Sequence, residues 1–136
     1  MGGTMTSLIQ KLAAALPNGR VAGPGDQDFL NCIRIDNGRI VRSPLAVVLP
    51  SDATDVSAAI LFARECGLHL TVRSGGHSAT GYCLNEGGIV LDMRSLGQLK
   101  LDVPREQMSL GMGAVWRDVY NSVRASRSGL VPVAGG

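Results

Sequence analysis

The chain opens with apolar positions spaced as on one face of a helix. Four residues carry this spacing: Leu8, Ile9, Leu12 and Leu16. The pattern predicts an amphipathic helix over residues 5–16, which Pro17–Gly19 ends. The next stretch, up to residue 43, is rich in Gly, Asp and Asn, so we expect it to be mostly loop.

A strand, a helix and another strand are predicted next. Ala46–Leu49 is a compact apolar run of the kind found in a buried strand. Ser51–Asp52 offers a helix N-cap and Gly67 a helix stop, so we predict a helix between them. Leu68–Arg73 then predicts a further strand. A strand–helix–strand unit is expected to give a parallel pair of strands.

Short elements with turns between them fill the second half of the chain. Residues 88–93, 97–102 and 107–112 have the composition of short strands, and residues 115–127 that of a helix. This order of elements indicates an α+β fold with mixed sheets, and α/β is the other class that the pattern allows.

Composition and charge exclude several classes of protein. With 136 residues, 45% of them hydrophobic, the chain can form one domain with a real core. The 13 basic and 11 acidic residues give a net charge of +2 and are dispersed, so we predict neither nucleic-acid nor membrane binding. The longest apolar run, Ala58–Ala63, is far too short to span a bilayer. Three cysteines, an odd number, and no evident signal peptide favour a cytoplasmic location.

The loop that follows Arg73 is the richest candidate site. Adjacent Gly75 and Gly76 allow close approach of a ligand to the backbone, and successive N–H groups in such a turn form a cradle for an anion such as phosphate. Arg73 could add positive charge, and Ser74 and Ser78 could add hydroxyl donors. The segment lacks the Gly-Lys-Ser/Thr of a P-loop and the Gly-x-Gly-x-x-Gly of a dinucleotide fold. The alternative interpretation is a tight turn that binds no ligand.

His77 stands in this loop and invites three functional interpretations. It could act as a general base, a ligand or a nucleophile, or it could be an ordinary surface histidine. A zinc site would need Cys66, His69 and Cys83 with His77, but there is no Cys-x-x-Cys pair and His69 alternates with apolar strand residues. We therefore predict no metal.

The other polar and aromatic residues give no clear indication of a functional role. The aspartates show no spacing that marks an acid–base couple, and most read as caps, strand ends or solvated helix positions. Asp55 falls in the first turn of its helix, where the dipole favours a carboxylate. Trp116 is predicted to lie in the core, the alternative being a flat surface beside a bound ring. Cys66 is predicted to pack at a helix end.

Five segments together resemble a known family. They are Pro44–Pro50, Val72–Ser78 with Gly81, Gly88–Met93, Gly111–Val119 and Gly129–Pro132. In this order they resemble the N-terminal FAD-binding domain of the FAD-linked oxidases. These form the vanillyl-alcohol oxidase and p-cresol methylhydroxylase superfamily, and the resemblance is strongest to its berberine-bridge-enzyme-like branch.

The resemblance implies a fold, a cofactor and a reaction. The fold would be a flavin-binding domain of the p-cresol methylhydroxylase type, with a small βαβ subdomain followed by the start of a second mixed-sheet subdomain. The cofactor would be FAD, and the reaction oxidation of a small organic substrate by hydride transfer, with O2 reoxidising the flavin. The FAD pyrophosphate would lie over the glycine turn, and His77 would bond covalently to the flavin 8α-methyl group. The implied cofactor-binding residues are Arg73, Ser74, Gly75, Gly76, His77, Ser78 and Gly81.

The resemblance also implies an incomplete protein. Residues 1–43 would be an N-terminal helix and loop region, and residues 44–136 a partial FAD-binding domain without its second half and without the substrate domain. Many members of the branch carry a second flavin-linking cysteine after the glycines that Gly135–Gly136 resemble, and Cys32, Cys66 and Cys83 do not fit that place. No catalytic residue is then expected in this chain. The alternative is a truncated, non-catalytic module that binds FAD or another phosphate ligand.

Overall fold

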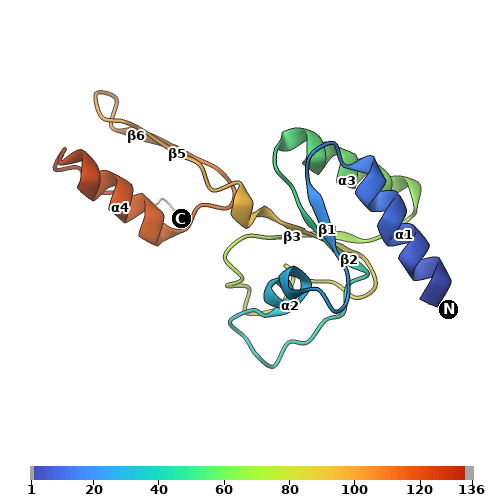
Figure 1. The fold of residues 1–136 in the computed structure, drawn as a ribbon. Coiled ribbons are helices and arrows are strands. Elements are labelled where there is room, and N and C mark those ends of the chain that lie inside the picture. Colours follow the sequence, from blue (N-terminus) through green and yellow to red (C-terminus); the bar gives the residue numbers. More distant parts are fainter. Residues whose placement is uncertain (1, 134–136) are drawn as a thin grey trace.

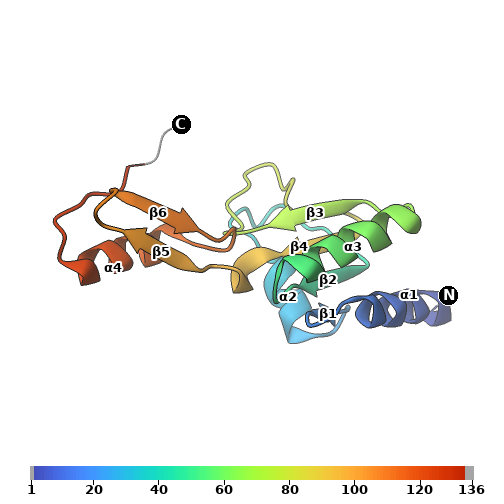
Figure 2. The same ribbon diagram turned by 90° about the horizontal axis from the view of Figure 1, so that it is seen from above.

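The computed structural model describes residues 2–133, which form two lobes joined end to end (Figures 1 and 2). The first lobe contains a four-stranded sheet with helices on both faces, and the second contains a two-stranded hairpin against one helix. The elements follow in this order: α1 (Gly2–Ala15), β1 (Arg20–Ala22), α2 (Gln27–Ile33), β2 (Ala46–Leu49), α3 (Ala53–Glu65), β3 (Leu70–Arg73), β4 (Ile89–Asp92), the 3-10 turn η1 (Met93–Ser95), β5 (Leu99–Asp102), β6 (Gln107–Leu110) and α4 (Trp116–Ser126).

Strands buried on both faces explain the continuous apolar runs of the sequence. Ala46 and Val48 point into a core under α1 and α3, whereas Val47 points into a core under α2. Ile89 and Leu91 share the first of these cores, and the intervening Val90 lies in the second. Successive strand side chains face opposite sides, so a strand covered on both sides must be apolar throughout.

The sheet confirms a mixed α+β architecture and the parallel direction of the two predicted strands. The strand order is β1-β2-β4-β3, with β1 antiparallel and the other three mutually parallel. β2 and β3 are parallel, as predicted, but they do not pair with one another because β4 lies between them. The sequence therefore predicted the direction of the two strands but not that a third strand lies between them, because the local pattern carries no information about a later strand.

Residues 20–33 form two elements that the sequence did not predict. β1 has only three residues, and α2 buries Phe29 and Cys32 at helical spacing. Asp26 accepts a hydrogen bond from the Gly23 N–H at 2.7 Å just before α2 begins. Since β1 pairs with β2 and α1 packs on α3, residues before 44 share the core of the first lobe. The division of the chain at residue 44 stays a prediction.

A buried carboxylate fixes the start of α3. The Asp52 side chain caps the helix by accepting from the backbone N–H groups of Thr54 and Asp55, as its position predicts. Asp55 itself is fully buried, not a solvated first-turn residue, and accepts from the N–H groups of Asn18 at 2.9 Å and Ser51 at 2.8 Å. Burial raises the pKa of Asp55, but these hydrogen bonds and one from Gly19 outweigh it and leave the pKa below its usual value.

The second lobe buries few side chains. Val119 and Val123 of α4 face the β5–β6 hairpin and are buried. Trp116 is 49% exposed, so the prediction that it lies in the core was wrong. Its ring centre lies 5.6 Å from that of Tyr120, which is also exposed. Cys66 is likewise exposed, not packed. No helix within residues 2–133 has the length and apolarity that a bilayer crossing needs.

Candidate cofactor site

The glycine loop lies where the two lobes meet. It leaves the carboxyl end of β3 beside the end of β4, with Arg73 in register with Asp92. Ligands of open parallel sheets bind at the carboxyl ends of strands, since the loops there are held by a rigid scaffold. The loop runs between the sheet of the first lobe and the N-terminus of α4 (Figure 2).

Arg73 is buried and holds the loop from inside. Its guanidinium donates hydrogen bonds to three backbone carbonyl oxygens, those of Cys32 at 2.9 Å, Ser74 at 2.7 Å and Arg34 at 3.3 Å. These bonds tie the glycine loop to the segment that follows α2. A contact between Arg73 and a cofactor stays a prediction, and the carbonyl contacts assign this guanidinium a clear structural role.

The glycines of the loop occupy positions at which a side chain would not fit. A Cβ on Gly75 would lie 2.6 Å from Cδ2 and 2.7 Å from Nε2 of His77. Gly76 has φ of +77°, and a Cβ there would lie 2.8 Å from Nη2 of Arg73. Gly81 has φ of +75° and packs against Ile40. The absence of side chains at Gly75 and Gly76 therefore makes room for the His77 ring and the Arg73 guanidinium, and permits the left-handed backbone that Gly76 adopts.

Three polar side chains project from this turn. The Ser74 hydroxyl donates to the Met112 carbonyl oxygen at 2.6 Å, and the Ser78 hydroxyl accepts from the Tyr82 N–H at 3.1 Å. The His77 side chain is 75% exposed, and its Nδ1 contacts a carboxylate oxygen of Asp36. Sequence reasoning missed Asp36, since nothing in a loop aspartate 41 residues away signals contact with His77.

A cavity opens between this turn and α4. Ser74, Gly75 and His77 form one wall, and the segment from Ala114 to Arg117 with Val119 and Leu110 forms the other. Its volume is about 450 Å³. A flat aromatic side chain, an exposed imidazole and a bare glycine backbone therefore surround one space. These residues fit a cofactor that has both a phosphate part and a planar ring.

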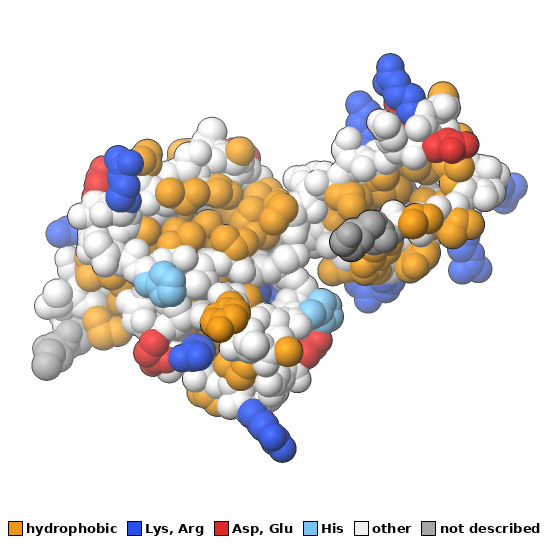
Figure 3. All heavy atoms as spheres, turned by 180° about the vertical axis from the view of Figure 1, so that it is seen from behind, with side chains coloured by type: hydrophobic (Ala, Val, Ile, Leu, Met, Phe, Trp, Pro, Cys, Tyr) orange, Lys and Arg blue, Asp and Glu red, His pale blue; other side chains and the backbone are white. Residues whose placement is uncertain are grey.

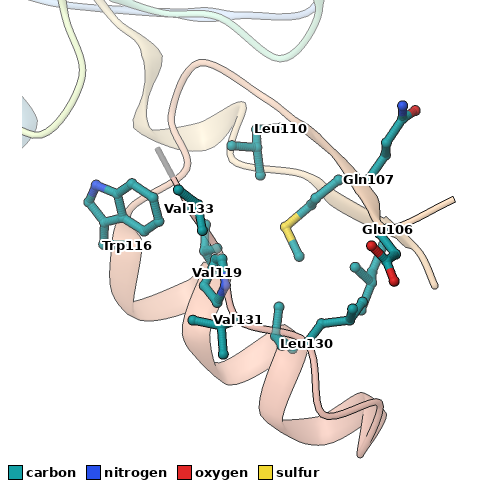
Figure 4. A pocket seen from close by; sticks show the side chains of 12 residues that line it. Glu106, Gln107, Leu110, Trp116, Val119, Leu130, Val131 and Val133 are labelled. Atoms are coloured by element: carbon teal, nitrogen blue, oxygen red, sulfur yellow. The ribbon is translucent and has the colours of Figure 1, made fainter. Parts of the chain in front are cut away.

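Another cavity, of about 350 Å³, lies within the second lobe between the hairpin and α4 (Figure 4). Its lining is mostly apolar, with Trp116 at one end and Glu106 and Gln107 at the other. Figure 3 shows hydrophobic side chains at the surface of both lobes, with Lys and Arg dispersed around them. This apolar surface carries no cluster of reactive groups within the described part of the chain.

A buried charged cluster supports the sheet behind the glycine loop. The Asp92 carboxylate is almost fully buried, and the Arg94 guanidinium binds both of its oxygens. Burial raises the pKa of Asp92, but Arg94 outweighs it and holds this pKa below its usual value. Burial, and then Asp92, raise the pKa of the neighbouring Cys32 thiol to about 12. Among residues 2–133, no three Cys, His, Asp or Glu side chains gather as metal ligands.

Comparison with known proteins identifies the chain. A family model described as "FAD binding domain" matches residues 44–135, which include the whole glycine loop. The chain belongs to this FAD-binding family. (R)-6-hydroxynicotine oxidase of Paenarthrobacter nicotinovorans is 35% identical over 129 residues, which are 94% of this chain and 28% of that protein. Berberine bridge enzyme-like 18 of Arabidopsis thaliana is 28% identical in an alignment 138 residues long, which covers 96% of this chain and 23% of that protein.

Solved structures agree with this assignment. The 6-hydroxy-D-nicotine oxidase of Arthrobacter nicotinovorans superposes with a TM-score of 0.77 at 32% identity, covering 82% of this chain and 24% of that one. Berberine bridge enzyme-like 1 of Physcomitrella patens has a TM-score of 0.78 at 24% identity over 90% of this chain, which supports the fold alone.

These findings confirm the resemblance drawn from the sequence. The chain is a flavin-binding domain of the p-cresol methylhydroxylase type, and its relatives include berberine-bridge-enzyme-like proteins. It spans about a quarter of the length of the relatives it matches, 28% of one and 24% of another. Gly135 and Gly136, to which the second flavin link was related, lie outside the described residues.

Proposed function

We propose that this chain is the FAD-binding portion of a flavin-dependent oxidoreductase that oxidises a small organic molecule, with O2 as final electron acceptor. The observation that carries the proposal is the position of His77, exposed on a bare glycine turn and lining the same cavity as Ala114 and Trp116. Two of the similar proteins are named as oxidases of 6-hydroxynicotine. FAD, when bound, supplies the acceptor for a hydride from the substrate.

The phosphate part of FAD is assigned to the glycine turn. Backbone N–H groups of the turn from Ser74 to Ser78 would donate to phosphate oxygens, because Gly75 and Gly76 place no side chain in the way. Ser78 accepts a hydrogen bond from Tyr82, which leaves its own hydroxyl proton to donate. Gly81 closes the loop, and Arg73 holds it from below.

His77 is assigned the covalent bond to FAD. A ring nitrogen of His77 would bond the carbon of the flavin 8-methyl group, with loss of the N–H proton of the ring and of one C–H hydrogen of the methyl group. The two hydrogens and the electron pair would pass to O2, giving hydrogen peroxide. An imidazole with an unprotonated nitrogen is a nucleophile, and the high exposure of His77 leaves its ring accessible.

The base and the contacts that select the substrate are assigned to residues outside this chain. None of the residues proposed here removes a proton from substrate. A second candidate is a non-catalytic module that holds FAD or another phosphate ligand at the same glycine turn.

Acid precipitation of the protein after incubation with FAD tests the proposal. We expect a fluorescent pellet from the unaltered chain and a colourless pellet from His77→Ala. The control variant His69→Ala, which removes an exposed histidine directly before β3, should also give a fluorescent pellet. A colourless pellet from the unaltered chain, with FAD bound before precipitation, would favour the non-catalytic module. Absence of FAD binding under native conditions would overturn the first candidate and would leave the second only with another phosphate ligand.

A further inference from the structure

Asp36 and His77 meet although 41 residues separate them. Their side chains are 68% and 75% exposed, so burial does not force the contact. Exposed ion pairs contribute little to stability, because both side chains lose freedom and water screens the charges. A contact that adds so little to stability but occurs at the proposed bonding residue points to a role in chemistry.

The backbone around Asp36 fixes where its carboxylate lies. The Asp36 N–H donates to the Gly76 carbonyl oxygen at 3.1 Å, and the Asn37 side-chain amide donates to the Ala79 carbonyl oxygen at 2.9 Å. Arg73 binds the carbonyl groups of Cys32, at the end of α2, and of Arg34, just after it. These four hydrogen bonds join the end of α2 and the residues that follow it to the glycine loop on both sides of His77.

The contact also determines the state of the imidazole. An ionised carboxylate only accepts hydrogen bonds, so Nδ1 of His77 carries the proton in this contact. A neutral ring then has its lone pair at Nε2. The Cδ2–Nε2 edge lies over Gly75, and Gly75 lines the cavity between the loop and α4. The unprotonated nitrogen is therefore on the cavity side.

We infer that Asp36 is the positioning residue for flavin attachment, holding the Nδ1–H form of His77 so that Nε2 bonds the FAD methyl carbon. This rests on the proposed function of His77. The ring becomes positively charged as Nε2 bonds carbon and before Nδ1 gives up its proton, and the Asp36 carboxylate stabilises that charge. A carboxylate behind an imidazole also fixes the ring orientation.

Two measurements on Asp36→Ala and Asp36→Asn test the inference. Without FAD, ¹⁵N NMR of the histidine-labelled chain should show the Nδ1–H form in the unaltered protein and a shift towards the Nε2–H form in both variants. With FAD, the rate of covalent attachment should fall about 10- to 100-fold in Asp36→Ala, while non-covalent FAD affinity changes little. Asp102→Asn, which alters a partly buried aspartate on the hairpin, far from the glycine loop in sequence, should change neither.

The outcomes separate this inference from the proposed function. Unchanged tautomer and attachment rate in a folded Asp36→Ala chain would overturn the role of Asp36 and leave the covalent bond standing. A flavin peptide bonded through Nδ1 would also overturn it. If the unaltered chain forms no covalent bond, the proposed role of His77 fails, whereas the NMR measurement still reports whether Asp36 sets the tautomer. Circular dichroism establishes that each variant is folded.

Discussion

The Ser74 hydroxyl donates a hydrogen bond of 2.6 Å to the Met112 carbonyl oxygen, and this bond crosses from the first lobe to the second. It links the glycine loop to the segment that leads into α4. The relative placement of the two walls of the candidate cofactor cavity therefore depends partly on one serine side chain.

Ser74→Ala should loosen the second lobe without unfolding the first. We expect a loss of about 1 kcal/mol, typical of one hydrogen bond, and faster amide exchange over residues 113–119. Ser95→Ala is the matched control, because the Ser95 hydroxyl donates to the Pro50 carbonyl oxygen at the same 2.6 Å within the first lobe. Equal exchange of residues 113–119 in both variants would contradict a special role for Ser74.

Arg73→Lys should destabilise the chain although it keeps the charge. A lysine ammonium cannot reproduce the fixed fork that reaches the carbonyl groups of Cys32, Ser74 and Arg34 together. Leaving buried groups without partners costs about 1–3 kcal/mol, which urea unfolding would measure. Arg105→Lys on the exposed hairpin pair should change stability by less than about 0.5 kcal/mol. Equal effects at the two arginines would refute the structural role of Arg73.

Gly76→Ala should cost more than Gly129→Ala. Both glycines have positive φ, +77° and +74°, so alanine at either position carries the left-handed penalty of about 1–2 kcal/mol. Only at Gly76 does the added Cβ approach the Arg73 guanidinium, at 2.8 Å, whereas nothing lies within 4 Å at Gly129. Because Arg73 is held by three carbonyl groups, we expect an extra loss of about 1.5–3 kcal/mol at Gly76. Equal melting temperatures of the two variants would show that Arg73 can move aside.

Asp55→Asn should reduce stability at neutral pH and change how stability depends on pH under acidic conditions. Asn18 and Ser51 donate to different oxygens of Asp55, and an asparagine keeps only one of these acceptors. One backbone N–H then faces an amide NH2 that cannot accept, so we expect a loss of about 1–3 kcal/mol at pH 7. The pKa of Asp55 lies below 3.8 in the folded chain, so its contribution is complete above pH 3.8 and disappears as pH falls through the folded-state value.

The difference in free energy of unfolding between the unaltered chain and Asp55→Asn should therefore become smaller as the pH falls below 3.8. Urea unfolding at a series of pH values measures it. Asp118→Asn changes another first-turn aspartate, on α4, whose side chain is 45% exposed, and should leave this pH dependence unchanged. A difference that stays constant down to pH 2 would argue against this account of Asp55.

Cys66 and Cys32 should react with iodoacetamide at very different rates. Cys66 is exposed, whereas Cys32 is fully buried and its thiol pKa is raised to about 12 by burial and by Asp92. Since the thiolate is the reactive form, mass spectrometry at pH 8 should find Cys66 labelled first and Cys32 unlabelled. Denaturant should make both reactive. Fast native labelling of Cys32 would mean that the core under α2 opens readily.

Local sequence signals predicted the elements that have clear ends. Asp52 and Gly67 bound α3 as expected, because a cap and a left-handed stop act within a few residues. α2 was missed because its buried positions, Phe29 and Cys32, are too few to establish a helical period. The exposure of Trp116 was missed because the apolar face of α4 is defined by the hairpin it packs on, which a helical pattern alone does not specify.

The candidate site was likewise predicted only where its residues are contiguous in the sequence. Ser74, Gly75, Gly76 and His77 were predicted from one contiguous motif, and their roles toward FAD stay predictions. Asp36 and the wall formed by Ala114 and Val115 depend on contacts between segments about 40 residues apart, so only the folded chain reveals them.

The position of β4 between β2 and β3 has a consequence for synthesis of the chain. A ribosome that has made residues 1–73 has delivered both outer parallel strands but not the central one. Those two strands emerge with unpaired edges, and pairing them with each other would close the place that Ile89–Asp92 occupies. The residue before the glycine turn, Arg73, gains its strand partner Asp92 only after that late insertion. Nascent chains shorter than about 92 residues are therefore expected to be chaperone clients, because unpaired strand edges and apolar faces promote misassembly.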